Sequence, residues 1–550
     1  MSITDPAGAR TDVAAAPTDP AGARRFRPLR QITGAVILVL VVLVVLRPRM
    51  PVNAYSPLAA GLIFGLALLL WVLVGDRLTS LARRLLPTDR IVAAVAAALV
   101  LLNGLIAGGV GYLGAYKVGW DASVFPFVAG LPIPEWPPWY VEYFSRYPNN
   151  HAMLGLADVA AASARIGLGY VSFMALYAGV AAALTALALY RVVVIARGGR
   201  PGIAALAVLV ILVSLSPWMG VAYTDMVGVW VPITAVWCLV SGLSRPPVPG
   251  LLLELLAGVL LGMGYLIKTT PIVGVVAGVL TLGLLALERG SRGRRRQLLL
   301  AVAALLVGTA VGLVGLRAVV ARTVPMPVLD RTVQASPWTY VAAGIHTTYY
   351  PDGERVFAYG GYNGDLDLET WNKPKAEQDE LSRIEIGRDL ERRGVLGTIM
   401  FEVDKFVFNN GDGMFWAYGE GSDLQAPRLH TGPLADALAA VNGPDGGHYH
   451  GRVLLTQVLW LAVLAAAGAG LVGLRRTLSP QTGVAVDLMI WNMIGIAAFM
   501  LLFQGRSRYL FGHVPVMIGL AMSVVPILRW PGARSRPVDR EASRPGQRDE

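Results

Sequence analysis

The stretch PLAAGLIFGLALLLWVLVG, residues 57–75, contains no charged side chain and decides the class of this protein. A run of about 17 to 25 apolar residues is long enough to cross the hydrocarbon core of a bilayer as a helix. Similar runs recur through most of the 550-residue chain, of which 55% is hydrophobic and 15% is charged. Ordinary soluble chains contain about 25% charged residues. The composition therefore predicts an all-α integral membrane protein and excludes a soluble α/β enzyme.

The apolar runs predict about twelve transmembrane helices. A count of eleven or thirteen also fits, because the first run is short and only IKTTP interrupts the stretch 250–287. The predicted spans are residues 32–46, 57–75, 91–115, 166–190, 202–218, 225–243, 250–267, 270–287, 298–320, 452–474, 484–503 and 509–528.

Arginine residues in alternate connectors predict the orientation of these helices. Cytoplasmic loops of membrane proteins are enriched in Lys and Arg. All the arginine-rich connectors fall on one side if the N-terminus is cytoplasmic, with Arg47 and Arg49 as the main exceptions. The formal charge of +11 is thus explained by membrane topology, and no basic patch indicates nucleic-acid binding. The arginine-rich segments are 24–30, 77–90, 191–200, 288–297, 475–476 and the tail after residue 529.

The same pattern divides the chain into five parts. Both ends are too polar to pack, so we predict disordered cytoplasmic termini. Two large segments are predicted to be extracytoplasmic: 116–165, with prolines and aromatics typical of an ordered interfacial loop, and 321–451, which includes a charged helical segment at 376–394. The parts are 1–30 (N-terminus), 31–320 (first transmembrane region, with the outer loop 116–165), 321–451 (outer segment), 452–529 (last three helices) and 530–550 (tail).

Five charged residues stand at outer turns that are far apart in the sequence: Asp121, Asp225, Lys268, Arg506 and Arg508. A charge at membrane depth costs a few kcal/mol unless it has a partner or a ligand, about 2.5–3.5 kcal/mol on insertion scales. Any one of them could be a snorkelling interfacial charge. Their coincidence on one face instead indicates a functional site.

The motifs around these charges resemble those of the polytopic GT-C glycosyltransferases, in particular the family 39-like, protein-mannosyltransferase-related branch. The resemblance covers roughly residues 91–528, and YPNN and GDGMFW are its most specific parts. The motifs are WDAS (120–123), YFSRYPNN (143–150), YTD (223–225), KFVFNNGDGMFW (405–416) and RSRYLF (506–511). The chain departs from the family in two ways: about three helices precede the catalytic loop, and the paired acidic motif is reduced to the single Asp121.

The resemblance implies an inverting transfer of a sugar from a polyprenyl-phosphate donor to a hydroxyl of a glycan, lipid or protein acceptor. The reaction would take place in the cell envelope, on the extracytoplasmic side of the cell membrane. Asp121 would be the base, because transfer to a hydroxyl requires a group that accepts its proton. Lys268, Arg506 and Arg508 would bind the phosphate. Asp225 would orient the base, contact sugar hydroxyls or pair with one of the cations.

The resemblance also implies substrate contacts for Tyr147, Asn149, Asn150 and Tyr509. From the sequence, the two asparagines either cap the helix that begins near His151 or turn their amides toward sugar hydroxyls. We expect mainly a structural role that shapes the catalytic loop. We predict no cofactor and no metal, because the six histidines show no metal-binding spacing and the paired acidic motif of the family is reduced to the single Asp121.

A multi-pass transporter or lipid flippase is the competing function, since about twelve helices also suit a carrier. The charges, however, lie at outer turns instead of at mid-span, and no internal repeat is evident. We therefore favour the glycosyltransferase.

Cys238 is the only cysteine in the sequence and lies within a predicted span, so no intramolecular disulfide is possible.

Overall fold

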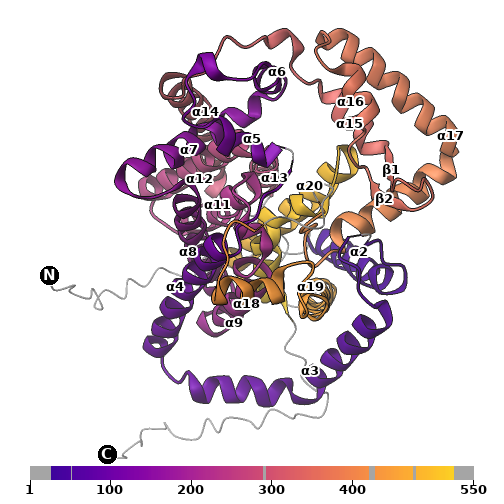
Figure 1. Ribbon diagram of the computed structural model, residues 1–550. Coiled ribbons are helices and arrows are strands. Elements are labelled where there is room, and N and C mark those ends of the chain that lie inside the picture. The colour runs from indigo at the N-terminus through magenta and orange to yellow at the C-terminus, as the bar shows by residue number, and fades with distance from the viewer. Residues whose placement is uncertain are drawn as a thin grey trace, which may run out of the picture.

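The computed structural model describes residues 26–50, 52–119, 121–288, 293–419, 428–474 and 478–525. Within them the chain forms a bundle of long helices that carries two further segments, built from helices and a small β-hairpin (Figure 1). The predicted disordered ends at 1–25 and 530–550 lie outside the described residues. Residues 27–30, which were assigned to the N-terminal tail, belong to the first helix of the bundle.

Nine stretches of helix in the described residues are long and apolar enough to cross a membrane. They are α2 (Arg27–Leu46), α3 (Pro57–Leu85), α4 (Asp89–Leu113), α8 (Tyr170–Arg197), Thr224–Gly242, α12 (Pro247–Ile267), α14 (Arg295–Thr323), α19 (Tyr449–Val472) and α20 (Pro480–Leu502). The stretch Thr224–Gly242 consists of α10 (Thr224–Val227) and α11 (Val231–Gly242). An integral membrane protein is thus confirmed, whereas the count of about twelve crossings stays a prediction.

The remaining predicted spans are also helical but shorter. The span 202–218 corresponds to α9 (Gly199–Leu209), which continues into a π-helical turn, and 270–287 corresponds to α13 (Ile272–Leu287). The span 509–528 is divided between a 3-10 helix, Ser507–His513, and α21 (Val514–Val524).

Glycines allow α12 and α14 to pack backbone against backbone. A Cβ atom on Gly258 would lie 2.2 Å from the carbonyl oxygen of Leu305, and one on Gly308 would lie 2.1 Å from that of Leu255. No side chain fits at either position. The hydrophobic effect does not drive helices together in lipid. Small residues at such crossings let the backbones approach closely, and van der Waals packing then stabilises the helix pair.

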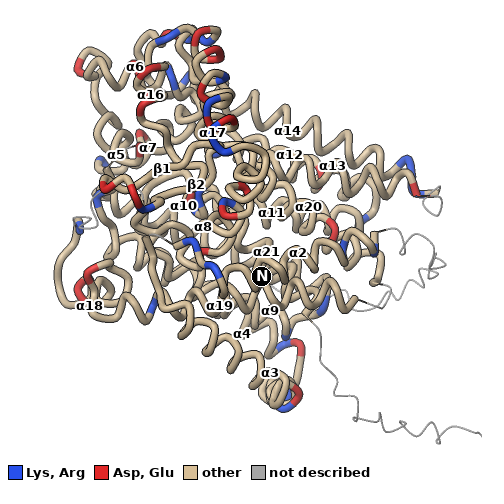
Figure 2. The backbone as a smooth tube through the Cα atoms, turned by 90° about the vertical axis from the view of Figure 1, so that its right-hand side faces the viewer, with Lys and Arg blue, Asp and Glu red and all other residues tan. Residues whose placement is uncertain are grey.

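The arginine-rich connectors meet at one end of the bundle. Arg200, at the start of α9, donates to the carbonyl of Leu86, which follows α3, at 2.6 Å. Arg197, at the end of α8, donates to the carbonyl of Val525 after α21 at 2.5 Å. Figure 2 shows charged residues at the helix ends and over the outer elements, with long uncharged stretches between them. The orientation of the bundle in the membrane stays a prediction.

The first outer segment is more helical than the ordered loop that its prolines and aromatics predict. It forms α5 (Asp121–Val128), α6 (Pro138–Arg146) and α7 (His151–Ala162), joined by short 3-10 turns. Pro138 stands in the first turn of α6, where its missing N–H costs nothing. Tyr143 and Phe144 bury the inner face of this helix.

The second outer segment contains a small β-hairpin as well as helices. Strands β1 (Thr347–Tyr349) and β2 (Val356–Tyr359) pair antiparallel, an element that the all-α prediction did not include. The predicted charged helix at 376–394 is the first half of a much longer helix, α17. The helices of this segment are α15 (Pro337–Ile345), α16 (Gly364–Thr370), α17 (Lys375–Asn410) and α18 (Pro433–Asn442).

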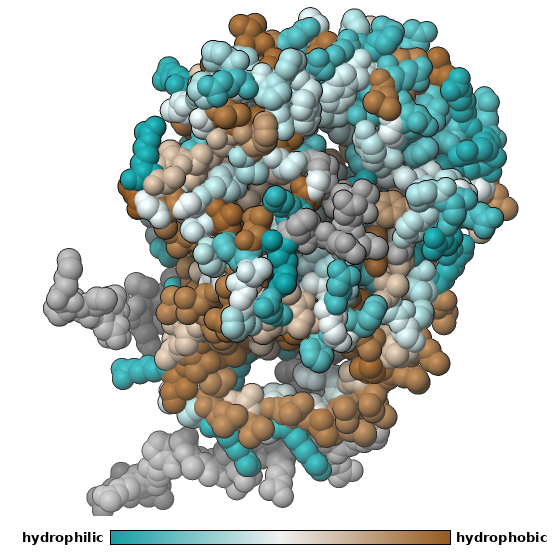
Figure 3. Space-filling view, in the orientation of Figure 1, coloured by the Kyte–Doolittle hydropathy of each residue, from teal (hydrophilic) through white to brown (hydrophobic). Residues whose placement is uncertain are grey.

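On the face seen in Figure 3, hydrophobic and hydrophilic side chains gather over different parts of the molecule. Figure 3 shows hydrophobic side chains over the lower part of the molecule, where α3 lies, and mainly hydrophilic ones over the upper part, where α6, α16 and α17 lie. Only 17% of the residues in the most apolar part of α3 are buried inside the protein, so most of this helix is available for contact with lipid.

Candidate functional site

Asp121 lies at the start of α5, where two tyrosine hydroxyls hold its carboxylate. Tyr223, from the turn before α10, donates to Oδ2 of Asp121 at 3.3 Å. Tyr143, from α6, also hydrogen-bonds to this carboxylate. Burial and, next, the Asp121 charge raise the pKa of Tyr143 well above its usual value, so that it stays a neutral donor. Two segments that are distant in sequence thus orient one acid.

Asp225 and Lys268 form an ion pair between the start of α10 and the end of α12. Asp225 is 2% exposed, and its Oδ2 has no hydrogen-bond partner among the described residues. Lys268 Nζ lies 4.8 Å from the centre of the Tyr509 ring. The pair is therefore buried and only partly satisfied by protein groups.

Arg508 connects this ion pair to Asp121. Its guanidinium lies 5.3 Å from the ring centre of Tyr509 and 5.8 Å from that of Tyr223. Tyr223 in turn donates to Asp121. Arg508 and Lys268, two of the three predicted phosphate ligands, therefore lie around one tyrosine, next to the residue that holds the predicted base.

Arg506, the third predicted cation, belongs to a neighbouring environment. Its guanidinium lies 5.8 Å from the centre of the Trp416 ring. Ser507, between the two arginines, donates to Asp412 at 2.9 Å. The RSRYLF stretch is thus fixed to the GDGMFW turn, and this contact fixes the place of both arginines.

The GDGMFW turn is a strained structure that Asp412 supports. Phe415, Trp416 and Tyr418 have positive φ angles of 53°, 62° and 61°, which non-glycine residues seldom adopt. Asp412 accepts the backbone N–H of Met414 at 2.8 Å and that of Trp416 at 2.6 Å. Strain of this kind costs about 1–3 kcal/mol per residue and concentrates at functional sites. Here it presents Trp416 to Arg506.

Lys405, at the start of the KFVFNNGDGMFW motif, has a structural position. It is fully buried and donates to the carbonyls of Gly344 at 2.6 Å and Leu501 at 2.5 Å. It therefore joins α17 to the ends of α15 and α20. The sequence motif that carried the resemblance combines this structural lysine with the strained turn.

Tyr147 takes part in a second polar cluster, which sequence reasoning missed. Arg146 donates to Oδ1 of Asp367 at 2.7 Å, and the Tyr147 hydroxyl donates to the same oxygen at 3.1 Å. Arg146 is 1% exposed, and its guanidinium lies 5.1 Å from the Trp371 ring centre. Burial raises the pKa of Tyr340, and Tyr509, Asp121 and Asp367 act in the same direction, against Arg146, so Tyr340 lies within electrostatic range of both clusters. In the sequence, Arg146, which directly precedes Tyr147 in YFSRYPNN, was the residue that could have indicated this cluster.

The side chains of the two asparagines make hydrogen bonds within the loop, and that of Asn150 does not cap the helix. Asn150 is the N-cap residue of α7, yet its side chain makes no capping hydrogen bond. It donates instead to the Tyr143 hydroxyl at 2.6 Å, while Asn149 donates to Asn150 at 3.2 Å. Asn150 is 3% exposed. The chain of contacts from Asn150 through Tyr143 thus ends at Asp121.

His346, Glu385 and Asp389 place ligand atoms within 4.8 Å of one another, between the end of α15 and α17. The Asn363 amide lies 3.3 Å from Nδ1 of His346 and 3.4 Å from Glu385. Arg392 donates to Asp389 at 2.7 Å. Oδ2 of Asp389 is buried and has no hydrogen-bond partner among the described residues.

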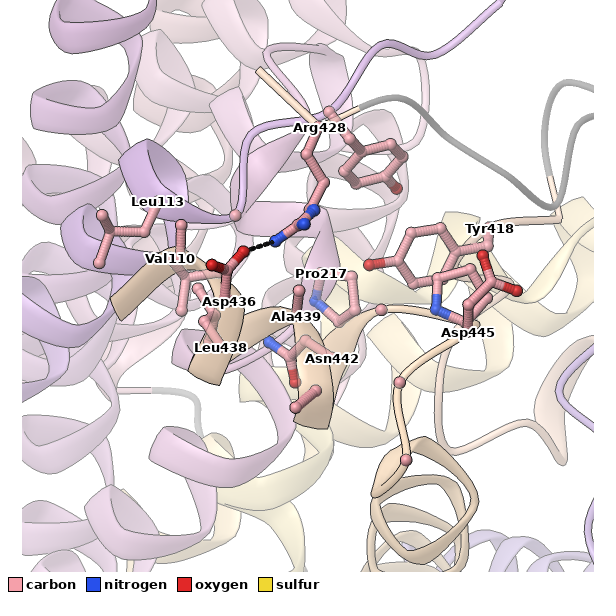
Figure 4. A pocket seen from close by; sticks show the side chains of 18 residues that line it. Val110, Leu113, Pro217, Tyr418, Arg428, Asp436, Leu438, Ala439, Asn442 and Asp445 are labelled. Carbon is pink, nitrogen blue, oxygen red and sulfur yellow. Dashed lines mark hydrogen bonds and ion pairs between the residues drawn. The ribbon is translucent and has the colours of Figure 1, made fainter. Parts of the chain in front are cut away.

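A separate cavity of about 540 Å³ opens between the end of α4 and α18 (Figure 4). The ion pair between Arg428 and Asp436, 2.7 Å long, stands at its wall, and Tyr418 and Asp445 lie on the other side. None of the predicted site residues lines this cavity. Tyr418 connects it to the strained turn.

The fold and these clusters define a polytopic helical membrane protein with a buried polar site at the turns between its helices. The chain matches the model of a family described as "Conserved hypothetical integral membrane protein" over residues 56–527, and it belongs to this family. The description assigns no activity. No curated protein and no solved structure matches the chain. The resemblance to GT-C glycosyltransferases therefore rests on the sequence motifs alone.

Proposed function

We propose that this protein is a membrane glycosyltransferase that transfers a sugar from a polyprenyl-phosphate donor to a cell-envelope hydroxyl on the extracytoplasmic side. The observation that carries the proposal is the convergence of Asp121, Arg508 and Lys268 around the tyrosines 223 and 509. These groups come from outer turns that are far apart in the sequence. An acid beside two cations suits a reaction that moves a proton and releases a phosphate.

In the proposed reaction, the acceptor oxygen forms a bond with the anomeric carbon of the donor sugar while the bond from that carbon to the phosphate oxygen breaks. The acceptor proton moves to the Asp121 carboxylate. The polyprenyl phosphate leaves with the bonding electron pair, and Arg508 and Lys268 stabilise its charge. Attack opposite to the leaving phosphate inverts the configuration of the sugar. No further reactant is needed, because the donor is already activated.

The protein surroundings give each group a distinct task. The hydroxyls of Tyr143 and Tyr223 fix the orientation of Asp121. Asp225 holds Lys268 in place until the phosphate arrives. An arginine suits two-point contact with phosphate oxygens, whereas a lysine acts as a point charge. We assign Tyr147 and the Asp367 cluster to the sugar or acceptor side, because Tyr147 adjoins the loop that carries the base.

The direct test is to incubate membranes that contain the protein with labelled polyprenyl-phosphate sugars and to look for a covalent product. Asp121→Asn keeps the size of the side chain and removes its basicity. We expect it to lower transfer by about 10²–10⁴, the usual contribution of a general base. Asp365→Asn, at an exposed position of the outer segment, is the matched control and should leave transfer unchanged.

Two outcomes would contradict the proposal. The first is full transfer by Asp121→Asn at unchanged expression, which would remove the base from the mechanism. The second is movement of labelled lipid across the bilayer of liposomes without any covalent product, which would identify a flippase or transporter instead.

A further inference from the structure

Helix α17 is interrupted at Gly394, and its exposed residues differ before and after this position. This residue has φ 62° and ψ −178°, a conformation outside the helical range that glycine adopts at little cost. Before it, the exposed positions of α17 are mainly charged, as in Glu380 and Arg388. The helix therefore consists of two segments, 375–393 and 395–410, joined at one glycine.

The second segment exposes only hydrophobic side chains along its first turns. Every exposed residue between positions 395 and 403 is Val, Leu, Ile or Met, and their spacing places them on one side of a helix. We call this set the apolar stripe. Its members and their exposed fractions are Val395 82%, Leu396 71%, Ile399 56%, Met400 48% and Val403 41%.

The opposite face of the same segment is already covered by the bundle. Phe401 and Phe408 are buried, and Lys405 donates to the carbonyl of Leu501 at the end of α20. At Gly411, just after the helix, a Cβ atom would lie 2.6 Å from a side-chain carbon of Val44 in α2. Helix α17 is thus fixed to the outer ends of two membrane-spanning helices with its stripe turned away from them.

Ion pairs join the stripe to the end of α2, a helix long and apolar enough to cross a membrane. Arg47 and Arg49 follow the last residue of α2, and both contact Asp404 of α17, at 3.2 and 3.0 Å. Val403 immediately precedes Asp404, and Met400 precedes it by about one turn, or roughly 5.4 Å along the axis. The stripe therefore begins at the depth where α2 leaves the membrane. These pairs also explain why arginines stand on the outer side, against the general pattern.

We propose that the apolar stripe of α17 lies in the outer leaflet, so that residues 395–403 form an interfacial helix that anchors the outer segment to the membrane. An amphipathic helix of this kind rests in the plane of the interface, with its apolar face among the acyl chains. The lipid is the occupant of this surface, because Asp404, next to the stripe, contacts Arg47 and Arg49 directly after α2, a helix long and apolar enough to cross a membrane. Gly394 then marks the point at which the chain leaves the lipid.

The proposal is independent of the catalytic assignment. It changes the predicted organisation of residues 321–451, because part of this extracytoplasmic segment is lipid-embedded. The charged first half of α17, the β-hairpin and the GDGMFW turn then all have a fixed height above the membrane. Lys405 joins α17 to α15 and α20 through hydrogen bonds, and Asp404 joins it to the end of α2.

The test uses the full-length protein in liposomes, with Cys238→Ser as background and one new cysteine per variant. Nitroxide labels at Leu396 and Met400 report on the apolar stripe, and labels at Glu380 and Arg388 on the first half of the same helix are the controls. Molecular oxygen concentrates in lipid, whereas a charged nickel chelate stays in water. We expect the ratio of oxygen to nickel accessibility to be several-fold higher at the two stripe positions than at the two controls.

Equal ratios at all four positions would show the stripe in water and overturn the proposal. Exclusion of both reagents from Leu396 and Met400 would show that a second copy or another part of the chain covers the stripe, which also overturns it. A label at Val403 repeats the measurement should either of the first two variants fail to fold. Elution of each labelled protein as the same species on size exclusion is the control for folding.

Discussion

Two ion pairs inside the helix bundle are built in opposite ways. Arg30 and Asp487 join α2 to α20 through two hydrogen bonds of 2.7 Å, so that both carboxylate oxygens are used. Asp225 and Lys268 join α10 to α12, but Oδ2 of Asp225 has no hydrogen-bond partner among the described residues. The first pair is complete within the protein. The second leaves a buried acceptor that a bound group can satisfy.

The difference separates a structural pair from a candidate functional one. A buried pair is tolerated when all its polar atoms are satisfied, because the cost of removing two charges from water must be offset. The Arg30 pair meets this condition at the arginine-rich end of the bundle. The Lys268 pair lies at the opposite end, next to Tyr509 and Arg508. The following predictions test whether this difference has the consequences that we assign to it.

The largest effect on stability is expected when the complete pair is broken. Arg30→Met leaves Asp487 buried without its partner and should lower the free energy of unfolding by about 3–5 kcal/mol. The double variant Arg30→Met, Asp487→Leu should recover most of this loss. Equilibrium unfolding in mixed micelles measures both, with Arg27→Met, at an exposed position, as control. A single variant as stable as the double would mean that the pair is not structural.

Removal of both charges of the Asp225–Lys268 pair should have a different result. The double variant Asp225→Leu, Lys268→Met removes both charges, so its stability should stay close to that of the unchanged protein. Its transfer rate should nevertheless fall by about 10²–10³, as on removal of one group that stabilises transition-state charge. The transfer assay and unfolding on the same preparation separate the two effects. Normal transfer by a stable double variant would make this pair structural as well.

A smaller effect is expected from the hydroxyl that connects Asn150 to Asp121. Tyr143→Phe removes one hydrogen bond to the proposed base, worth about 0.5–1.5 kcal/mol, which corresponds to a loss of roughly tenfold in kcat. KM for the donor should change little, since the phosphate ligands remain. Tyr140→Phe, on the same helix, is the control because Tyr140 stacks on Phe127. An equal loss in both variants would point to a general effect on α6.

The smallest effect concerns His346 and pH. Burial lowers the pKa of His346 below 6.5, and the nearby Arg392 and Arg393 act in the same direction, against Asp389 and Glu385. The unfolded chain therefore binds more protons than the folded one as pH falls below 6.5, and stability should decrease there. His346→Gln should make the unfolding free energy less dependent on pH between 6.5 and 5. An unchanged pH profile would assign the dependence to other groups.

The described structure also shows where sequence reasoning succeeded and where it failed. The long helices coincide with the apolar runs, because hydrophobicity over about 20 residues reports directly on membrane insertion. The charged segment predicted at 376–394 was only half of α17, because apolar residues alternate with polar ones in 395–410 and leave no continuous apolar run. The β-hairpin was missed because its strands are only three and four residues long.

The candidate site shows the same limit. Asp121, Lys268 and Arg508 were selected as isolated charges beside apolar segments, a feature that can be read along the chain. Arg146 and Asp367 were not selected, because a charge within a polar loop is not unusual by itself. Only their contact at 2.7 Å, between residues 221 positions apart, makes them a cluster.

The sequence by itself determined that this is a helical membrane protein, which segments are apolar enough to span and which connectors carry arginines. These properties depend on residues that are neighbours in the chain. The tertiary structure alone decided which charges meet. Arg30 reaches Asp487 across 457 positions, and Tyr223 reaches Asp121 across 102. Such contacts depend on how the helices pack, and in α12 and α14 the packing is set by glycines whose partners lie on another helix. No local pattern contains that information.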